Sequence, residues 1–188
     1  MRILVAAFAA ALFFAGAAEA RNWRIRPGPT AEQALQTALI EARPGDSIRL
    51  ARGRFELSGG LSLDVDRVTI RGEGEDKSIL SFTNQRRGAE GLLVTSDGVV
   101  LRDFAVENAK GDGIKARDCR GITFRRVRAE WTNGPDSNNG AYGLYPVNCS
   151  DVLIVESIAR GASDAGIYVG QSRNIIVRDN VAEFNVAG

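Results

Sequence analysis

The chain has 188 residues, with 24 basic and 23 acidic side chains and a formal net charge of +1, so it lacks the basic excess typical of nucleic-acid-binding proteins. It contains no histidine, which excludes Ser-His-Asp and Cys-His triads, histidine zinc sites and c-type haem attachment. Its single methionine is Met1, which excludes thioether copper sites and leaves oxygen ligation of the kind that Ca²⁺ prefers.

The first 20 residues have the pattern of a secretory signal peptide. Arg2 supplies the positive charge, residues 3–16 are uncharged and mostly apolar, and residues 18–20 fit a small-x-small cleavage site. The apolar run is shorter than the roughly 20 residues that a membrane-spanning helix needs. We therefore expect cleavage after Ala20, a mature domain of residues 21–188, and a periplasmic or secreted protein without a membrane span.

One helix is predicted at residues 30–43. Residues Thr30 to Gln33 have a capping-box pattern, an apolar stripe follows at helical spacing, and a Pro-Gly-Asp turn ends the helix. The preceding residues 21–29 predict a loose leader, and residues 47–51 alternate as a strand does. The helix is placed to cover the open apolar end that a repeat structure would otherwise expose.

From residue 68 onward the chain repeats a short apolar strand followed by a glycine. The interval from each glycine to the next strand is 8 or 9 residues, whereas the interval from each strand to its glycine ranges from 14 to 23. Such self-similarity with β periodicity predicts an all-β, single-stranded parallel β-helix, a solenoid of about six rungs over residues 47–188. The strands start at Val68, Val99, Ile122, Val152 and Ile175, and the glycines are Gly91, Gly113, Gly143 and Gly166.

Two insertions lengthen the variable connection. Residues 72–90 are rich in charge, and residues 131–142 are rich in turn-forming residues, with Trp131 and Tyr142 at their ends. Because both fall in the same connection, we expect them to project from the same side of the solenoid. Loops on a rigid scaffold are where binding residues usually lie.

The register also predicts a strip of outward side chains. Two residues after each repeat glycine come Leu93, Lys115, Tyr145 and Tyr168, and apolar neighbours indicate that these positions face solvent. Successive rungs lie about 4.8 Å apart, so the side chains should stack. Further polar and aromatic residues lie just before the glycines: Glu90, Asp112, Tyr142 and Asp164.

This strip contains the candidate catalytic residues. A β-elimination needs a base and an acid, which makes Lys115 the candidate base and Tyr145 and Tyr168 the candidate acids. Aromatic faces also stack on sugar rings, and charged groups bind uronates. The alternative is an ordinary tyrosine ladder beside a solvated lysine. The candidate substrate contacts are Asp112, Arg117, Trp131, Tyr142 and Asp164.

Residues 136–140 begin like a calcium-binding loop. Asp136 is the candidate ligand, and a Ca²⁺ held by Asp112, Asp136 or Asp164 could neutralise a uronate carboxylate. The segment lacks the later glutamate of an EF-hand, and clusters of Asp, Asn and Gly more often form plain turns. Ca²⁺ is therefore one candidate cofactor, and no cofactor is required by the sequence.

Cys119 and Cys149 occupy the same repeat position, because they and the strands after them are both 30 residues apart. On adjacent rungs their Cα atoms would lie about 4.8 Å apart, within the range of a disulfide, and export supplies oxidising conditions. A stack of small residues without a bond is the alternative.

Arginines follow several of the strands and should also stack. Acidic residues follow Arg102 and Arg178, and Glu156 holds the equivalent position in an intervening copy. Since like charges directly opposite are unfavourable, a mutually compensated charge ladder is favoured over a rail for an acidic polysaccharide. The arginines in question are Arg71, Arg102, Arg125 and Arg178.

The amphipathic helix, the Pro-Gly-Asp turn, the Ile48–Leu50 strand and the Gly53–Phe55 segment resemble the N-terminal cap of pectate-lyase-like, right-handed β-helix proteins. Residues 166–180 resemble the repeats of that superfamily, and also those of periplasmic repeat proteins related to the nitrous-oxide-reductase accessory protein. The resemblance implies a right-handed fold over residues 30–188. It also implies two candidate functions, because the scaffold hosts lyases, epimerases, hydrolases and proteins without chemistry.

The first candidate function is an exported protein that binds an acidic polysaccharide and cleaves or epimerises it. The second is a non-catalytic periplasmic repeat module that docks a partner protein. A hydrolase ranks below a lyase, because Asp112 and Asp164 would lie two rungs apart, roughly 10 Å by the rung spacing. The chain ends in mid-rung at Gly188, so we expect either a longer native solenoid or a second chain over the open end.

Overall fold

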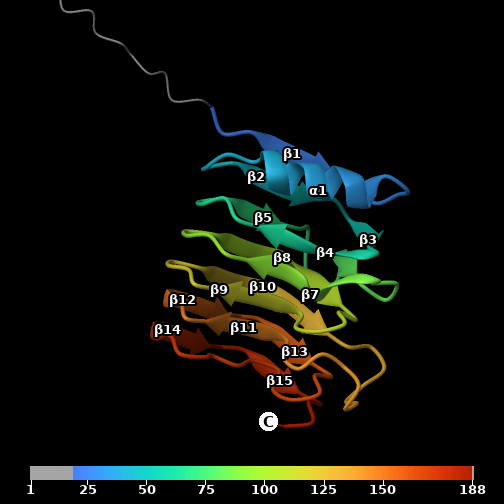
Figure 1. Cartoon of the computed structure of the whole chain (residues 1–188), viewed down its shortest axis with the longest axis vertical. Coiled ribbons are helices and arrows are strands. Elements are labelled where there is room, and N and C mark those ends of the chain that lie inside the picture. Colours follow the sequence, from blue (N-terminus) through green and yellow to red (C-terminus); the bar gives the residue numbers. More distant parts are fainter. Residues whose placement is uncertain (1–18, 188) are drawn as a thin grey trace, which may run out of the picture.

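The computed structural model describes residues 19–187, and residues 1–18 of the predicted signal peptide lie outside this part. The chain winds into a column of stacked rungs with one helix near its N-terminal end (Figure 1). The elements are β1 (Asn22–Ile25), α1 (Ala31–Glu41), β2 (Ser47–Leu50), β3 (Gly53–Glu56), β4 (Gly59–Leu63), β5 (Thr69–Arg71), β6 (Ser78–Ser81), β7 (Arg87–Val94), β8 (Val100–Glu107), β9 (Ile114–Arg117), β10 (Thr123–Glu130), β11 (Leu144–Val147), β12 (Ser150–Val155), β13 (Ile158–Arg160), β14 (Arg173–Arg178) and β15 (Val181–Glu183).

Each complete rung has three sides, and all strand pairs are parallel. The first face runs β1-β2-β5-β8-β10-β12-β14, and the third face runs β4-β7-β9-β11. The second face is formed by β3, β6, the later halves of β8 and β10, β13 and β15. The predicted parallel β-helix is therefore confirmed, and the first face has six strands from β2 to β14, in agreement with about six rungs.

The predicted strand column is correct in register. Val152 pairs with Ile175, and the adjacent residues of β5, β8, β10 and β12 pair in step, so that the five predicted strand starts stack. Val68, Val99 and Ile122 are completely buried and form part of one continuous core. Apolar residues spaced two apart thus line the inside of the solenoid, as strand geometry requires.

A ladder of glycines explains the second repeated signal. Leu92 donates its backbone N–H to the Gly113 carbonyl, and the same bond recurs from Ile114 to Gly143. A Cβ atom on Gly91 or Gly113 would lie 2.7 Å from the carbonyl oxygen of the glycine one rung further on. Side chains are therefore excluded at these positions because the backbones of neighbouring rungs approach too closely.

The helix that was predicted to cover the N-terminal end of the solenoid is present, but the capping box predicted at the start of this helix does not form. Leu35, Ala38 and Leu39 are buried against the first rungs, which closes the N-terminal end of the core. Thr30 makes no capping hydrogen bond with its side chain. The Glu32 carboxylate instead accepts hydrogen bonds from the backbone N–H and hydroxyl of Ser58, linking the helix to the turn before β4.

The loose leader expected at residues 21–29 is wrong in part, because residues 22–25 form β1. This strand pairs with β2, with Trp23 opposite Ile48 and Ile25 opposite Leu50. Ile25 is buried, and Trp23 packs against the core. Burial of these two side chains beside α1 orders the segment.

The sequence prediction did not contain the second face, because it treated the residues between each strand and the following glycine as a loop. A single residue in the left-handed region, Asp103 or Arg126, bends β8 and β10 between the first and second faces. The insertion expected at 72–90 contains β6 and the start of β7, so it is divided into the 72–77 loop and a second connection at residues 82–86. The 72–77 loop lies between the first and second faces, whereas residues 82–86 and residues 131–142 both lie between the second and third faces. The prediction that the two insertions share one side is therefore wrong for residues 72–77 alone.

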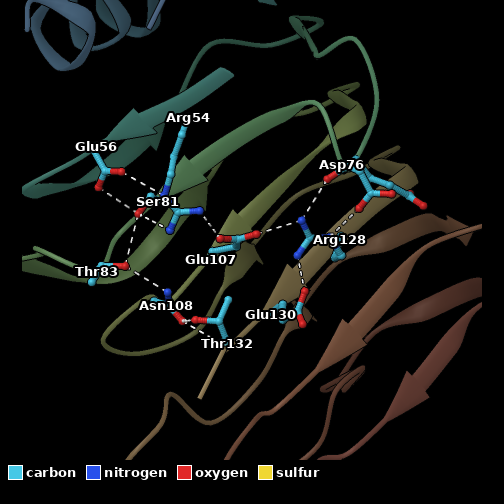
Figure 2. A network of polar contacts seen from close by, with 11 residues as sticks. Arg54, Glu56, Asp76, Ser81, Thr83, Glu107, Asn108, Arg128, Glu130 and Thr132 are labelled. Atoms are coloured by element: carbon cyan, nitrogen blue, oxygen red, sulfur yellow. Dashed lines mark hydrogen bonds and ion pairs between the residues drawn. The ribbon is translucent and has the colours of Figure 1, made fainter. Parts of the chain in front are cut away.

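A buried ion network crosses the second face (Figure 2). Glu107 accepts hydrogen bonds from Arg54 at 2.5 Å and from Arg128 at 2.8 Å, and its side chain is only 6% exposed. Arg128 also pairs with Glu130, and with Asp76 of the 72–77 loop at 3.5 Å. The network ties the loop and three rungs together, and every charged group in it has a partner.

Within the described part of the chain, no helix has the length and hydrophobicity that crossing a bilayer requires.

Cys119 and Cys149 lie on adjacent rungs, as their spacing predicts. Both are buried free thiols in this structure, with their sulfur atoms 2.6 Å apart. The hydrogen bond between the two sulfur atoms, together with burial, raises the pKa of the Cys119 thiol, and the same hydrogen bond lowers the pKa of the Cys149 thiol. Whether the pair is oxidised stays a prediction.

We expect Glu107→Gln to lower the free energy of unfolding by about 3 kcal/mol, because two arginines lose a buried counter-charge. The matched control is Glu183→Gln in the same register column, whose partner Arg160 lies 2.7 Å away and is 35% exposed. A half-exposed pair should contribute less than about 1 kcal/mol. Urea unfolding of both variants measures the difference, and equal losses would contradict a special role for the network.

We also expect the protein folded under oxidising conditions to contain a Cys119–Cys149 disulfide, seen as an intact mass lower by two hydrogens. Reduction should lower the free energy of unfolding by about 3.5 kcal/mol, as expected for closing a loop of this length. Cys149→Ser serves as the control that shows neither change. Complete alkylation of both cysteines in denatured, unreduced protein is the result that rules the bond out.

Candidate functional site

The outward side of the third face gathers most of the predicted site residues. Leu93 pairs with Lys115, and Lys115 pairs with Tyr145, on β7, β9 and β11. Tyr168 comes next in the column, because Leu144 bridges to Ile167. Ile114, Ala116 and Leu144, which flank these positions, are completely buried. Strand alternation therefore directs Lys115 and the tyrosines to the surface.

Two carboxylates hold the lysine. The Lys115 Nζ lies 3.3 Å from the Asp112 carboxylate and 3.7 Å from that of Glu90. It also lies 5.0 Å from the centroid of the Tyr145 ring, the geometry of a cation–π contact. Burial raises the pKa of the Asp112 carboxyl, and the charge and hydrogen bond of Lys115 oppose that rise. The result is a compact, partly desolvated acid–base cluster.

Three tyrosines adjoin this cluster. The Tyr142 and Tyr168 rings stack with centroids 4.7 Å apart, and Tyr145 lies 4.7 Å from Tyr142 in a tilted arrangement. Desolvation, and then the negative charge of Asp164, raise the pKa of the Tyr142 hydroxyl. Tyr168 is 40% exposed, so the cluster presents an aromatic face to solvent.

We name Glu90, Asp112, Lys115, Tyr142, Tyr145, Tyr168 and Asp164 the third-face site. Tyrosine faces can stack on sugar rings, carboxylates can accept hydrogen bonds from sugar hydroxyls, and the lysine and tyrosines can exchange protons. Carboxylates outnumber the single ammonium group, so the site itself does not supply a positive field. Glu90 was not chosen as a contact from sequence, although it precedes Gly91 as Asp112 precedes Gly113.

Two predicted contacts lie outside this site. Arg117 is exposed at the end of β9 and pairs with Asp118 at 3.2 Å. Trp131 is a core residue, which corrects its assignment to substrate: it is 4% exposed, and its indole N–H donates to the Ala109 carbonyl at 2.7 Å. The alternation continues inward from Val127 and Ala129 to Trp131, and that signal could have placed it in the core.

Asp136 lies alone in the 131–142 loop. Its carboxylate accepts hydrogen bonds from the backbone and side-chain N–H groups of Asn138, both at 2.8 Å, which lower its pKa. This is an Asx turn of the kind that favours a plain loop. Among residues 19–187, no three acidic or cysteine side chains gather as a metal site would require. Asp112, Asp136 and Asp164 thus do not form one.

Comparison with known proteins identifies the family. The model described as "Right handed beta helix region" matches residues 60–188. Among curated proteins the comparison finds no match. Two solved structures are similar, and both are under 25% identical to this chain. The first of them, with a TM-score above 0.5, supports the fold alone.

An alginate lyase from Paenibacillus sp. str. FPU-7 superposes with a TM-score of 0.57 at 21% identity, over 84% of this chain and 58% of the lyase. The chain thus spans little more than half the length of that enzyme. A proposed glycosyl hydrolase from Parabacteroides merdae ATCC 43184 has a TM-score of 0.47 at 15% identity, over 84% of this chain and 93% of its own. Because the family model covers well over half of the sequence and the rungs are parallel and three-sided, the chain belongs to the right-handed β-helix family.

Proposed function

We propose that this β-helix binds an acidic polysaccharide at the third-face site and processes it by lyase or epimerase chemistry. The observation that carries the proposal is the placement of Lys115 against Asp112 and Tyr145 on the outer side of a rigid sheet. A similar fold in an alginate lyase supports the substrate class. The signal-peptide pattern of residues 1–20 supports export to the periplasm or the medium.

Both reactions begin by removing the proton from the carbon beside a uronate carboxylate. Lys115 is the nitrogen base in the cluster, and Asp112 and Glu90 hold its position. In a lyase, the C4–O bond then breaks, a C4–C5 double bond forms, and a tyrosine hydroxyl protonates the leaving oxygen. In an epimerase, a tyrosine instead returns a proton to the opposite side of C5. Tyr145 and Tyr168 lie close enough to share this role, with ring centroids 5.5 Å apart.

A non-catalytic periplasmic module that docks a partner protein is the second candidate function. The observation that favours it is the internal pairing of the site: Lys115 is engaged by two carboxylates, and the tyrosines pack on one another. Such a ladder stabilises a sheet without any chemistry. Loss of protein capture in Lys115→Met, with unchanged behaviour toward polysaccharides, would support this function over the first.

The test is a screen of pectate, alginate and related acidic polymers, with and without Ca²⁺. Absorbance of unsaturated uronates detects a lyase, and uptake of solvent deuterium at C5 detects an epimerase. Lys115→Met should lower turnover by about 10²-fold or more, the usual contribution of a positioned base. Tyr168→Phe should lower it less, because Tyr145 remains.

The matched control for this screen is Lys77→Met, which removes an exposed lysine of the 72–77 loop far along the chain from the site. It should leave turnover unchanged. Absence of both unsaturated product and deuterium uptake on every polymer, in folded protein, removes the catalytic proposal. If Lys115→Met and Lys77→Met lower turnover equally, the proposed role of Lys115 as the base is wrong.

A further inference from the structure

A single column of arginines runs along the outer side of the first face. Arg24 pairs with Arg49, Arg49 with Arg71, and Arg71 with Arg102, so the four guanidinium groups project from successive rungs. Arg125 continues the column on β10. The sequence prediction contained the later members. It missed Arg24 because it assigned no strand to residues 22–25, and it did not align Arg49, in the predicted strand at 47–51, with the later arginines.

The column divides into a compensated and an uncompensated part. Arg102 pairs with Asp103 at 3.2 Å, Arg125 with Glu156 at 3.3 Å, and Arg178 with Asp179 at 2.5 Å. Within residues 19–187, the ion pairs include none from Arg24, Arg49 or Arg71. The expected compensated ladder therefore exists only on the later rungs.

The residue that directly follows each arginine explains why some arginines have a counter-charge and others do not. An acidic residue follows Arg102 and Arg178, whereas Ile25, Leu50 and Gly72 follow the three upper arginines. The corner that supplies counter-charges on the later rungs thus has none on the first three.

Arg49 lies at the centre of the uncompensated part. Its Nε atom is buried and has no hydrogen-bond acceptor in the described part of the chain. Desolvation, followed by the charges of Arg71, Arg24 and Arg102, lowers the pKa of its guanidinium. An arginine does not lose its proton in a protein, so solvent or a bound anion, and not loss of the proton, is what can relieve this repulsion.

The same three arginines line an open cleft of about 440 Å³ at the N-terminal end of the first face. Arg26 adds a fourth guanidinium, and Glu73, which is exposed, is the one carboxylate among the lining residues. Figure 1 shows the strands that carry this cleft, β1, β2 and β5, stacked beside the helical cap. Four arginines against one carboxylate form a focused positive field.

We infer that this arginine cleft is a second binding site, which holds an acidic polysaccharide by the carboxylates of successive sugar units. Rungs lie about 4.8 Å apart, close to the length of one sugar unit in an extended chain, so each rung can meet one acidic group. The planar guanidinium matches a carboxylate in bidentate geometry. The polymer's identity rests on the proposed function, whereas the anion site rests on the arginines alone.

The cleft also supplies what the third-face site lacks. That site has more carboxylates than ammonium groups, whereas the cleft is strongly positive and lies on a different face. A polymer held at both would gain affinity through effective concentration. The cleft is thus an anchoring site, distinct from the residues that are proposed to react.

The experiment uses the full chain carrying Lys115→Met, so that no turnover consumes the probe. Titration calorimetry measures binding of a short pectate oligomer and of its methyl-esterified form. The double change Arg49→Gln with Arg71→Gln should weaken binding of the charged oligomer by about tenfold or more, as expected for lost charge-assisted hydrogen bonds. Added salt should reduce this difference, because the cleft is open to solvent.

The matched control is Arg125→Gln, a substitution in the same column whose arginine already has Glu156 as its partner. It should change the affinity by less than about twofold, as expected for an exposed pair. Thermal melting checks folding: the Arg49→Gln, Arg71→Gln protein should melt no lower than its parent without the oligomer, because like-charge repulsion is removed. The parent should gain melting temperature with the oligomer, and the double variant should not.

Three results overturn the inference: unchanged affinity in the double variant, an equal loss in Arg125→Gln, or equal binding of the esterified oligomer. Tighter binding of a phosphate polymer than of the pectate oligomer overturns the assignment to polysaccharide. The two proposals fail separately. Turnover without cleft binding removes only the anchoring site, and cleft binding without turnover by the Lys115 protein removes only the catalytic proposal.

Discussion

Parallel backbone hydrogen bonding between rungs, held in one register, is the constraint on which the other features depend. Leu92 donates to Gly113, and the bond recurs from Ile114 to Gly143 and from Leu144 to Gly166. Because the rungs that share this spacing stack in register, a residue type at one repeat position becomes a column of that type in space. The columns include buried aliphatic residues, side-chain-free glycines, tyrosines and arginines. Stacking therefore repeats a contact between neighbouring rungs along the whole column, whether that contact is favourable or unfavourable.

The charged side chains form favourable contacts on the second face and unfavourable contacts on the neighbouring first face. On the second face, Glu107 lies between Arg54 and Arg128, so the buried charges of Glu107 and Arg128 are neutralised by each other and by partners nearer the surface. On the first face, Arg49 lies between Arg24 and Arg71 with no carboxylate opposite. A stack of like charges persists only if solvent or a ligand compensates it, since guanidinium groups stay protonated. The difference between the faces separates a structural network from a candidate binding surface.

In the two proposals, the third-face site and the arginine cleft would recognise different features of one acidic polymer. The third-face site offers aromatic surface and proton-exchanging groups, with Lys115 held by Asp112 and Tyr145 beside it. The arginine cleft offers charge without aromatic residues. Lys115 and Tyr145 of the first site, and Arg24, Arg49 and Arg71 of the second, lie on strands. The 131–142 loop contributes only Tyr142 to the third-face site, because its Trp131 belongs to the core and its Asp136 closes a turn.

From the sequence by itself came the parallel solenoid, the helical cap, the stacking of Cys119 with Cys149, and the third-face column through Lys115 and Tyr145. Each is a consequence of period-two alternation and a constant glycine-to-strand interval, which a local pattern records. Only the tertiary structure decided the second face, the pairing of Glu107 with Arg54 and Arg128, and the cleft among the first arginines. Those outcomes depend on where single left-handed residues such as Asp103 turn the chain, and on which side chains of other rungs then meet, and no interval along the chain encodes either.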